Sequence, residues 1–448
     1  MTRIGSISVL ALLAALAACA PKQIPLAGER LDPRDVTGSG AALDVSQTGA
    51  ALASEGPRAV AISLPAQTRN AEWTHRGGSA SHDFVNAAIG AGTTPVWTAP
   101  IGAGAGRKHR ITADPVVAQG RIFTLDSRAG VVATSEAGAT LWSSDLTPAG
   151  ERADDASGGG LATSGGKVFV STGFGELVAL DAATGAVIWR QELPAAVGGA
   201  PAVSGDLVYV VSRDSTAYAI RTSDGKIQWQ LAGLPSRTGV TGVAGPGVDG
   251  QIVVFPFGTG DLKAVLKKGG RDLWTGRVAG NRLGRAYTAI RDVTGDPVIA
   301  GGRVYAGTSA GRMTAFDARS GAEIWSATQG PLGPVQVAGG SVFLVSDNSQ
   351  LVRLDAATGA QVWAIDLPYY VPVSKDKKRR DIRAHYGPVL AGGKLFVASS
   401  DDTLRVFDPV SGQMTATAPI AGGASSAPVV ANGTLYVVSA DGVLHAYR

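Results

Sequence analysis

Cysteine is nearly missing from the 448-residue sequence, and its scarcity excludes several kinds of site. A single Cys cannot form an internal disulfide, nor can it supply a Cys-rich zinc or iron–sulfur centre. The five His residues never stand at His-x-x-x-His or His-Glu-x-x-His spacing, so a zinc site is not indicated. The sequence also lacks an Asp-x-Asp-x-Asp-Gly loop for calcium. We therefore expect no metal, no cofactor and no catalytic residue.

Charge of one sign and long apolar runs are also scarce. The 40 basic and 36 acidic residues leave a net charge of +4, which does not favour nucleic acid as a partner. After the first 18 residues, no segment is long and apolar enough to cross a bilayer as a helix. The remainder of the chain is therefore expected to fold outside the bilayer.

Glycine and proline, by contrast, are abundant. The chain holds 61 Gly and 23 Pro, about a fifth of its residues, yet 45% of the residues are apolar. A chain this apolar can bury a core and does not need to remain disordered. No Gly-X-Y period is present, which excludes collagen. The combination favours many tight turns between many short strands.

The N-terminus has the composition of a bacterial secretory signal. Arg3 precedes a short apolar run from Ile4 to Ala18, which is followed by Cys19, the only Cys. The boundary, Leu16-Ala-Ala-Cys19, resembles the lipobox of bacterial lipoproteins, in which the Cys is acylated and becomes the first mature residue. We predict a signal peptide over 1–18 and lipidation of Cys19. The alternative is an ordinary signal cleaved near Ala18.

The residues after Cys19 predict where the anchor sits and how the chain leaves it. Ala20 and Pro21 follow, and neither is the Asp that keeps such lipoproteins at the inner membrane of enteric bacteria. The resemblance therefore implies the periplasmic face of the outer membrane. Residues 19–69 carry Pro, Gly, Ser and scattered charge without a repeated pattern, which predicts a flexible tether.

From residue 70 onward the sequence repeats. Gly, one variable residue and an apolar run with an aromatic or Val recur eight times, beginning at Gly120, Gly166, Gly205, Gly250, Gly302, Gly340, Gly393 and Gly433. In seven copies a Pro precedes this Gly, at Pro115, Pro201, Pro246, Pro297, Pro334, Pro388 and Pro428. From Trp97 onward, Trp recurs in steps of 38 to 51 residues, at Trp142, Trp189, Trp229, Trp274, Trp325 and Trp363. The alternation of apolar and polar residues within each unit predicts four antiparallel strands.

Four strands in a repeat of this length form one blade of a β-propeller. We predict an all-β, eight-bladed propeller over residues 70–448, with Trp in the seams between blades; seven blades is the alternative. The last copy ends without its Trp strand, and Trp97 precedes the first blade without one of its own. We therefore expect the strand around Trp97 to complete the last blade and close the ring. In the seventh copy we expect Met414 to fill the place of Trp.

The unit Gly-x-Val-Tyr … Leu-x-Ala-Leu-Asp-Ala-x-Thr-Gly-x-x-x-Trp resembles the repeat of pyrroloquinoline-quinone propellers, over residues 95 to 448. Members of that group that are dehydrogenases carry an adjacent Cys pair, a calcium site and a catalytic Asp in a longer chain. The Cys pair is impossible here, so the resemblance implies the fold rather than an enzyme.

A lipobox, a tether and this propeller together resemble the BamB family of lipoproteins from the outer-membrane β-barrel assembly machinery. The resemblance implies a scaffold that docks on the periplasmic POTRA region of BamA, the barrel insertase, beside other assembly subunits and possible contacts with unfolded outer-membrane proteins. The family's Leu-x-Leu-Arg loop corresponds to Leu234-Pro-Ser236-Arg237, with Ser236 in place of the second Leu. Its Asp-x-Asp loop corresponds to Asp292-Val-Thr294, with Thr294 in place of the second Asp. The alternative is that both are ordinary connections between blades.

A basic insertion separates Trp363 from Gly393. It contains Lys375, Lys377, Lys378, Arg379 and Arg380. These residues could contact anionic lipid headgroups or an acidic partner; the alternative is a solvated loop. Two other functions remain open for the whole chain: a ligand-binding or quinone-dependent enzyme, and an envelope scaffold unrelated to barrel assembly.

Overall fold

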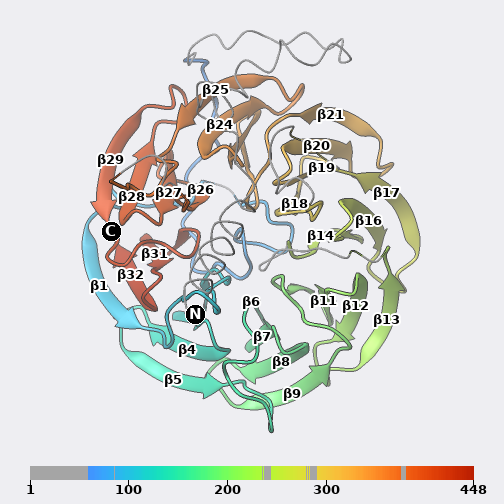
Figure 1. Cartoon of the computed structure of the whole chain (residues 1–448). Coiled ribbons are helices and arrows are strands. Elements are labelled where there is room, and N and C mark those ends of the chain that lie inside the picture. The colour runs from blue at the N-terminus through green and yellow to red at the C-terminus, as the bar shows by residue number, and fades with distance from the viewer. Residues whose placement is uncertain are drawn as a thin grey trace, which may run out of the picture. The chain divides into compact units, whose positions relative to one another are not determined.

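The repeat unit folds into a four-stranded antiparallel sheet, and eight such sheets form a ring (Figure 1). The computed structural model describes residues 59–84, 86–234, 236, 244–278, 280, 282, 290–374 and 380–448. Within these residues there are 32 strands and no helix, so the predicted all-β, eight-bladed propeller is confirmed. No helix in this part of the chain is long and apolar enough to cross a membrane.

The strands of blades 1 to 7 run from the ring axis outward in chain order, and in blade 8 the outer strand is β1. Blades 1 to 4 consist of β2 (Val116–Ala118), β3 (Arg121–Leu125), β4 (Gly130–Ser135), β5 (Thr140–Asp145); β6 (Gly159–Ser164), β7 (Lys167–Thr172), β8 (Glu176–Asp181), β9 (Val187–Glu192); β10 (Ala202–Ser204), β11 (Leu207–Val211), β12 (Thr216–Arg221), β13 (Ile227–Ala232); and β14 (Gly247–Asp249), β15 (Ile252–Pro256), β16 (Asp261–Leu266), β17 (Asp272–Arg277). Blades 5 to 8 consist of β18 (Gly295–Ala300), β19 (Arg303–Thr308), β20 (Arg312–Asp317), β21 (Glu323–Ala327); β22 (Gln336–Ala338), β23 (Ser341–Val345), β24 (Gln350–Asp355), β25 (Gln361–Asp366); β26 (His385–Ala391), β27 (Lys394–Ser399), β28 (Thr403–Phe407), β29 (Met414–Pro419); and β30 (Val429–Ala431), β31 (Thr434–Val438), β32 (Val443–Tyr447), β1 (Pro95–Pro100).

The ring is closed by the two ends of the propeller. Strand β1 pairs antiparallel with β32, with Trp97 opposite Ala446, so the predicted closure is confirmed. In Figure 1 the light-blue β1 lies beside the red β32. Because this pairing completes blade 8, β32 is not left as the exposed edge of a three-stranded sheet.

Tryptophan holds neighbouring blades together, as predicted. The indole of Trp142 in blade 1 donates to the carbonyl oxygen of Ala182 in blade 2 at 3.1 Å, and the same bond recurs at five other seams. Gly185 lies under this indole with a φ of 75°, and a Cβ there would come within 2.5 Å of the Trp142 ring. The Thr-Gly of the repeat is therefore required both by the turn and by the approach of Trp.

The prediction for Met414 is wrong. A β-bulge shifts the pairing within the outer hairpin of the blades, and in blade 7 it places Met414 opposite Phe407 and Ala416 opposite Val406. In blade 6, the residue at the position of Ala416 is Trp363, opposite Arg353. The place of Trp is therefore taken by the half-buried Ala416, whereas Met414 is 56% exposed.

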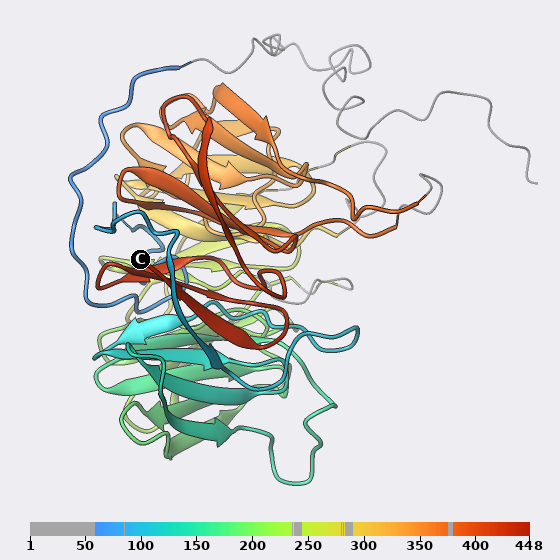
Figure 2. The same ribbon diagram turned by 90° about the vertical axis from the view of Figure 1, so that its left-hand side faces the viewer.

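Each propeller has two faces, which we name by what lies on them. The connection face carries the links between blades, such as residues 193–201, and the turns between second and third strands, such as 257–260. The turn face carries the turns between first and second strands, such as 119–120, and between third and fourth strands, such as 182–186. Figure 2 shows the blue segment before β1 along the turn face, on the left, and loops of the connection face projecting to the right.

That blue segment contains a strap, residues 68–88, which the repeat analysis did not detect. The strap hydrogen-bonds to the inner hairpin of every blade in ring order, through Asn70 (blade 8), Trp73 (blade 1), Thr74 (blade 2), His75 (blade 3), Ala80 (blade 4), Ser81 (blade 5), Phe84 (blade 6) and Ala87 (blade 7). Its two ends meet, because the amide of Ala88 donates to the carbonyl oxygen of Thr68 at 2.8 Å. The strap thus closes into a loop that links all eight blades.

Residues 1–58, which include the predicted signal peptide, Cys19 and most of the predicted tether, lie outside the described residues. The end of that predicted tether contacts the blades. Arg353 of β24 donates to the carbonyl oxygen of Val60 at 2.6 Å, and Asn86 of the strap donates to that of Pro65 at 3.0 Å. The chain therefore reaches the propeller about ten residues before the predicted start at residue 70.

Candidate functional site

The connection face of blades 3 to 5 brings together the two loops predicted to bind a partner. Ser236 follows β13 of blade 3, and Asp292 precedes β18 of blade 5. Both contact Gly258, in the β15–β16 turn of blade 4: a Cβ there would meet Asp292 Oδ1 and Ser236 Cβ, each at 3.0 Å. The two loops, more than fifty residues apart in sequence, thus meet at the β15–β16 turn. We call this meeting point, formed by Ser236, Gly258 and Asp292, the platform.

Leu234 is the exposed residue beside this platform. Its side chain is 63% exposed, the highest value for a large apolar side chain in the described part of the chain. The preceding residue, Gly233, packs its backbone closely against the ring of Phe257. A Cβ on Gly233 would come within 2.6 Å of that ring. The amide of Gly233 also donates to the carbonyl oxygen of Ser215 at 2.7 Å. Leu234 therefore follows a residue, Gly233, whose backbone is held by both packing and a hydrogen bond.

Asp292 and Thr294 lie beneath the surface. Asp292 is 2% exposed and Thr294 is 9% exposed. The Thr294 hydroxyl donates to the carbonyl oxygen of Pro331 at 2.8 Å, and its amide donates to that of Gly307 at 3.0 Å. These contacts tie the link before blade 5 to the link before blade 6. The structure therefore shows both residues as supports of the loops rather than as exposed contacts.

A second support lies in the link between blades 4 and 5. The guanidinium of Arg282 makes a bidentate ion pair with Asp347 at 2.7 and 3.0 Å, and it donates to the carbonyl oxygen of Thr328 at 2.6 Å. The Arg282 and Asp347 side chains are 12% and 1% exposed. Paired Arg–carboxylate geometry of this kind fixes orientation as well as position. It anchors the link to blade 6.

Most of the other predicted contact residues lie outside the part of the chain that the structure describes. Arg237, Lys375, Lys377, Lys378 and Arg379 lie outside the described residues, and Arg380 is exposed. The chain on either side of the basic insertion forms a short ladder on the connection face. Tyr370 pairs with Ile382, and the amide of Val371 donates to the carbonyl oxygen of Asp381 at 3.0 Å. The insertion thus extends from the same face as Leu234.

Exposed apolar side chains are unevenly distributed over the connection face. In the part of the chain that the structure describes, the large ones on this face are Leu234, Leu332, Val373 and Ile382, at 63%, 41%, 41% and 58% exposure. They lie on the links from blade 3 to 4, 5 to 6 and 6 to 7. The other exposed large apolar residues lie on outer strands or, for Val60, before the strap. One half of the connection face is thus more apolar than the other.

The ring axis holds a buried charge cluster centred on Arg76 of the strap. Arg76 Nε lies 3.3 Å from Asp114, just before β2, and Nη1 lies 3.1 Å from Asp296 of β18. Asp114 also accepts from the amide of Ala427 at 2.7 Å, and Asp296 from that of Gly245 at 2.6 Å. Burial alone would lower the pKa of Arg76, but Asp296 and Asp114 raise it overall. One guanidinium therefore joins elements of blades 1, 4, 5 and 8.

His75 lies beside this cluster in its neutral form. Burial, together with His82, lowers the pKa of His75 to about 3. Its Nε2 accepts from the amide of Val203 at 2.9 Å, so the ring hydrogen is on Nδ1, which lies 2.8 Å from the Thr74 hydroxyl. A second proton on the ring would occupy Nε2 and break the bond to blade 3.

This geometry predicts a loss of stability in acid. Unfolded His75 takes up a proton below pH 6.5, whereas folded His75 stays neutral to about pH 3, so stability falls as the pH drops through this window. Between pH 7 and 4.5 we expect a loss of roughly 2–3 kcal/mol from this residue. His75→Gln keeps an acceptor for Val203 but cannot titrate. Denaturant unfolding at both pH values should show a shallower pH dependence in this variant.

A matched control is His109→Gln, since the ring of His109 bonds to the carbonyl oxygen of Asp154, at 3.0 Å, in the link between blades 1 and 2. The His109 variant should keep the wild-type pH dependence. An identical pH dependence in His75→Gln and the wild type would rule out His75 as the source.

Comparison with known proteins identifies related chains. The family model described as outer membrane protein assembly factor BamB matches residues 127–365 and 373–448. An assembly factor BamB from Yersinia pestis is 27% identical over 241 residues, which are 52% of this chain and 60% of that one. One from Shewanella oneidensis is 29% identical over 246 residues, 51% of this chain and 60% of that one. The chain therefore matches about three fifths of the length of these relatives.

Solved structures share the fold. The crystal structure of BamB from Moraxella catarrhalis superposes with a TM-score of 0.65 at 22% identity, covering 80% of this chain and 99% of that one. Quinohemoprotein alcohol dehydrogenase from Comamonas testosteroni gives 0.66 at 16% identity, covering 85% and 81%. At these identities the likeness concerns the propeller alone. Within the described residues, no group of three or more His, Cys, Asp or Glu side chains could hold a metal ion.

Proposed function

Since the chain belongs to the family of outer membrane protein assembly factors BamB, we propose that it is a non-enzymatic scaffold of outer-membrane protein assembly. The observation that carries this proposal is the match of the family model to most of the propeller. Curated relatives from two organisms bear the same description. The proposal includes two further points: the chain is a subunit of the assembly complex, and it assists the folding of outer-membrane barrels.

We further propose that the propeller docks on the periplasmic POTRA region of a BamA-like insertase through the connection face of blades 3 to 5. The exposed Leu234, beside the platform, supplies an apolar anchor. Arg237 follows it in sequence and would add a charged donor, and such pairings often dominate binding energy. The buried Asp292 and Thr294 hold the loops that present them.

Affinity purification of the full chain from detergent-solubilised outer membranes tests the proposed function. We expect a BamA-like insertase to co-purify. Recovery of another envelope complex without an insertase would instead support a scaffold unrelated to barrel assembly. A bound quinone chromophore in the purified protein would support the alternative of a quinone-dependent enzyme.

The proposed location rests on lipidation of Cys19 at the periplasmic face of the outer membrane. Acyl chains hold a protein at a membrane by burying methylene groups, at about 0.8 kcal/mol each. We expect Cys19→Ser to abolish incorporation of labelled fatty acid and to reduce the membrane-bound fraction at least about tenfold. Ala20→Asp serves as the matched variant and should keep the label. A labelled, membrane-bound Cys19→Ser protein would contradict the anchor assignment.

A further inference from the structure

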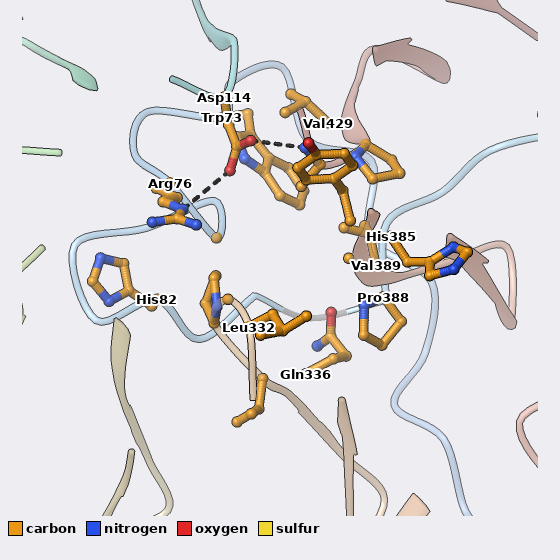
Figure 3. A pocket seen from close by; sticks show the side chains of 18 residues that line it. Trp73, Arg76, His82, Asp114, Leu332, Gln336, His385, Pro388, Val389 and Val429 are labelled. Carbon is orange, nitrogen blue, oxygen red and sulfur yellow. Dashed lines mark hydrogen bonds and ion pairs between the residues drawn. The ribbon is translucent and has the colours of Figure 1, made fainter. Parts of the chain in front are cut away.

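A small pocket lies on the ring axis, with the strap as its floor (Figure 3). Its volume is about 50 Å³. Figure 3 shows Trp73, Arg76 and Asp114 on one side and Leu332, Gln336 and Pro388 on the other. Leu332, on the link between blades 5 and 6, is 41% exposed, so the pocket is reached from the connection face. The strap blocks the turn-face side.

The floor of the pocket offers hydrogen-bond donors. Trp73 is 2% exposed, and its buried Nε1–H has no hydrogen-bond partner among the residues that the structure describes. The indole is held in place by Phe84 of the strap, with ring centroids 4.4 Å apart. Arg76 pairs with its two aspartates through Nε and Nη1, and its Nη2 lies 3.7 Å from the point where a Cβ of Gly333 would stand. A ligand must therefore accept a hydrogen bond, which an ammonium group cannot do.

The charge around the floor argues against an anion. The guanidinium of Arg76 is already paired with two carboxyl groups, those of Asp114 and Asp296. His75 and His82 add no positive charge, because burial lowers the pKa of both. A carboxylate or phosphate ligand would therefore meet no unpaired positive charge in this buried setting, which disfavours its binding. The Asp114 carboxylate, meanwhile, can accept further hydrogen bonds beyond those from Arg76 and Ala427.

A neutral group that both accepts and donates fits these conditions. A buried water needs roughly 10–15 Å³ of such space, so the pocket holds about three to five water-sized groups. The –CH₂–CO–NH₂ end of an Asn or Gln side chain is of this size. Its oxygen would face Trp73 and Arg76, its nitrogen would face Asp114, and its methylene would contact Val389 and Val429 in the wall.

We propose that the axial pocket binds a primary amide, the side chain of an Asn or Gln residue on a protein docked at the connection face. The pocket's preference for an amide is independent of which partner supplies it. Identifying that partner with the assembly machinery rests on the proposed function.

The test follows the indole Nε1–H resonance of Trp73 by ¹⁵N NMR on the full soluble chain, with the resonance assigned from Trp73→Phe. Propionamide is the probe, and propionate and propylammonium are its charged counterparts. We expect a saturable shift with millimolar propionamide and at least tenfold weaker responses to the two ions. No response to propionamide, or equal responses to all three solutes, would overturn the proposal and leave a pocket for ordered water only.

A blocking variant makes the test specific to the pocket. A Cβ at Gly333 would meet only Arg76 Nη2, at an ordinary contact distance of 3.7 Å, so Gly333→Leu fills the pocket without backbone strain. It should remove the propionamide response while the melting temperature stays close to that of the wild type. Gly106→Leu, where a Cβ meets nothing within 4 Å, is the matched control and should respond fully. A retained response in a folded Gly333→Leu protein would place the probe elsewhere. Neither outcome depends on a partner, so failure here is distinct from failure of the proposed function.

Discussion

Arg76→Ala should lower the free energy of unfolding by about 3–5 kcal/mol, because it leaves two buried carboxylates without their cation. Asp296 is fully buried and the Asp114 side chain is 8% exposed, so neither charge can recover its solvation in the folded state. The loss should also loosen four blades together, since the two carboxylates accept from the amides of Ala427 and Gly245. Chemical denaturation followed by circular dichroism measures the effect.

Two further variants separate the charge effect from lost packing. Arg76→Met combined with Asp114→Asn and Asp296→Asn removes all three charges, and it should recover a large part of the loss. Arg128→Ala breaks the ion pair with Asp154, in which both side chains are 47% exposed, and should cost less than about 1 kcal/mol. If Arg76→Ala were no more destabilising than Arg128→Ala, the buried cluster would contribute no more to stability than an exposed ion pair.

Leu234→Glu should weaken capture of the insertase at least about tenfold while leaving the propeller intact. The side chain is 63% exposed, so the folded protein tolerates the charge, whereas an apolar anchor in an interface does not. Arg237→Glu should act in the same direction by reversing the adjacent charge. Pull-down from solubilised outer membranes, with quantification of the bound insertase, measures both variants.

A matched control for this prediction is Leu141→Glu. Leu141 is 48% exposed on the outer strand β5, away from the connection face. It should capture the insertase at wild-type strength. Equal weakening by Leu141→Glu and Leu234→Glu would point to a general effect of charge, and full capture by Leu234→Glu would remove blade 3 from the interface.

The blades could be predicted from sequence because each one uses the same local chemistry. The aromatic residue of the Gly-x-Val-Phe landmark packs against the Trp of the same blade, as Phe123 does with Trp142 at 5.8 Å between ring centroids. Gly in the outer turn makes room for the Trp of the preceding blade. These requirements recur at most seams, so they appear as a period. Closure by β1 could be predicted because the last repeat lacks a Trp strand and the strand around Trp97 has no blade of its own.

The strap could not be predicted in this way because its contacts do not repeat. It meets each blade through a different residue, and most of its bonds are made by backbone atoms, which leave no trace in the sequence. Trp73 was the available signal: it is an eighth Trp that fits no blade, within a short stretch that also contains His75 and Arg76. Met414 was misassigned for a related reason, since the β-bulge that shifts the outer strand cannot be seen in the sequence.

The candidate site was only partly predictable. The exposure of Leu234 could be predicted, because the residue comes directly after an outer strand, where the link to the next blade is exposed. The burial of Asp292 and Thr294 depends on Gly258 and Pro331, which come from other blades, so it required the fold. The supporting pair of Arg282 and Asp347, which also joins two blades, was missed for the same reason.

We have proposed that the connection face of blades 3 to 5 docks on a BamA-like insertase. Site-specific photo-crosslinking in intact cells tests it directly, with the photoreactive residue placed at position 234 and, as a control, at position 141. We expect a crosslink from position 234 to the periplasmic part of the insertase and none from position 141. Crosslinks from position 141 but not from position 234, or from neither position in cells where the two proteins co-purify, would contradict it.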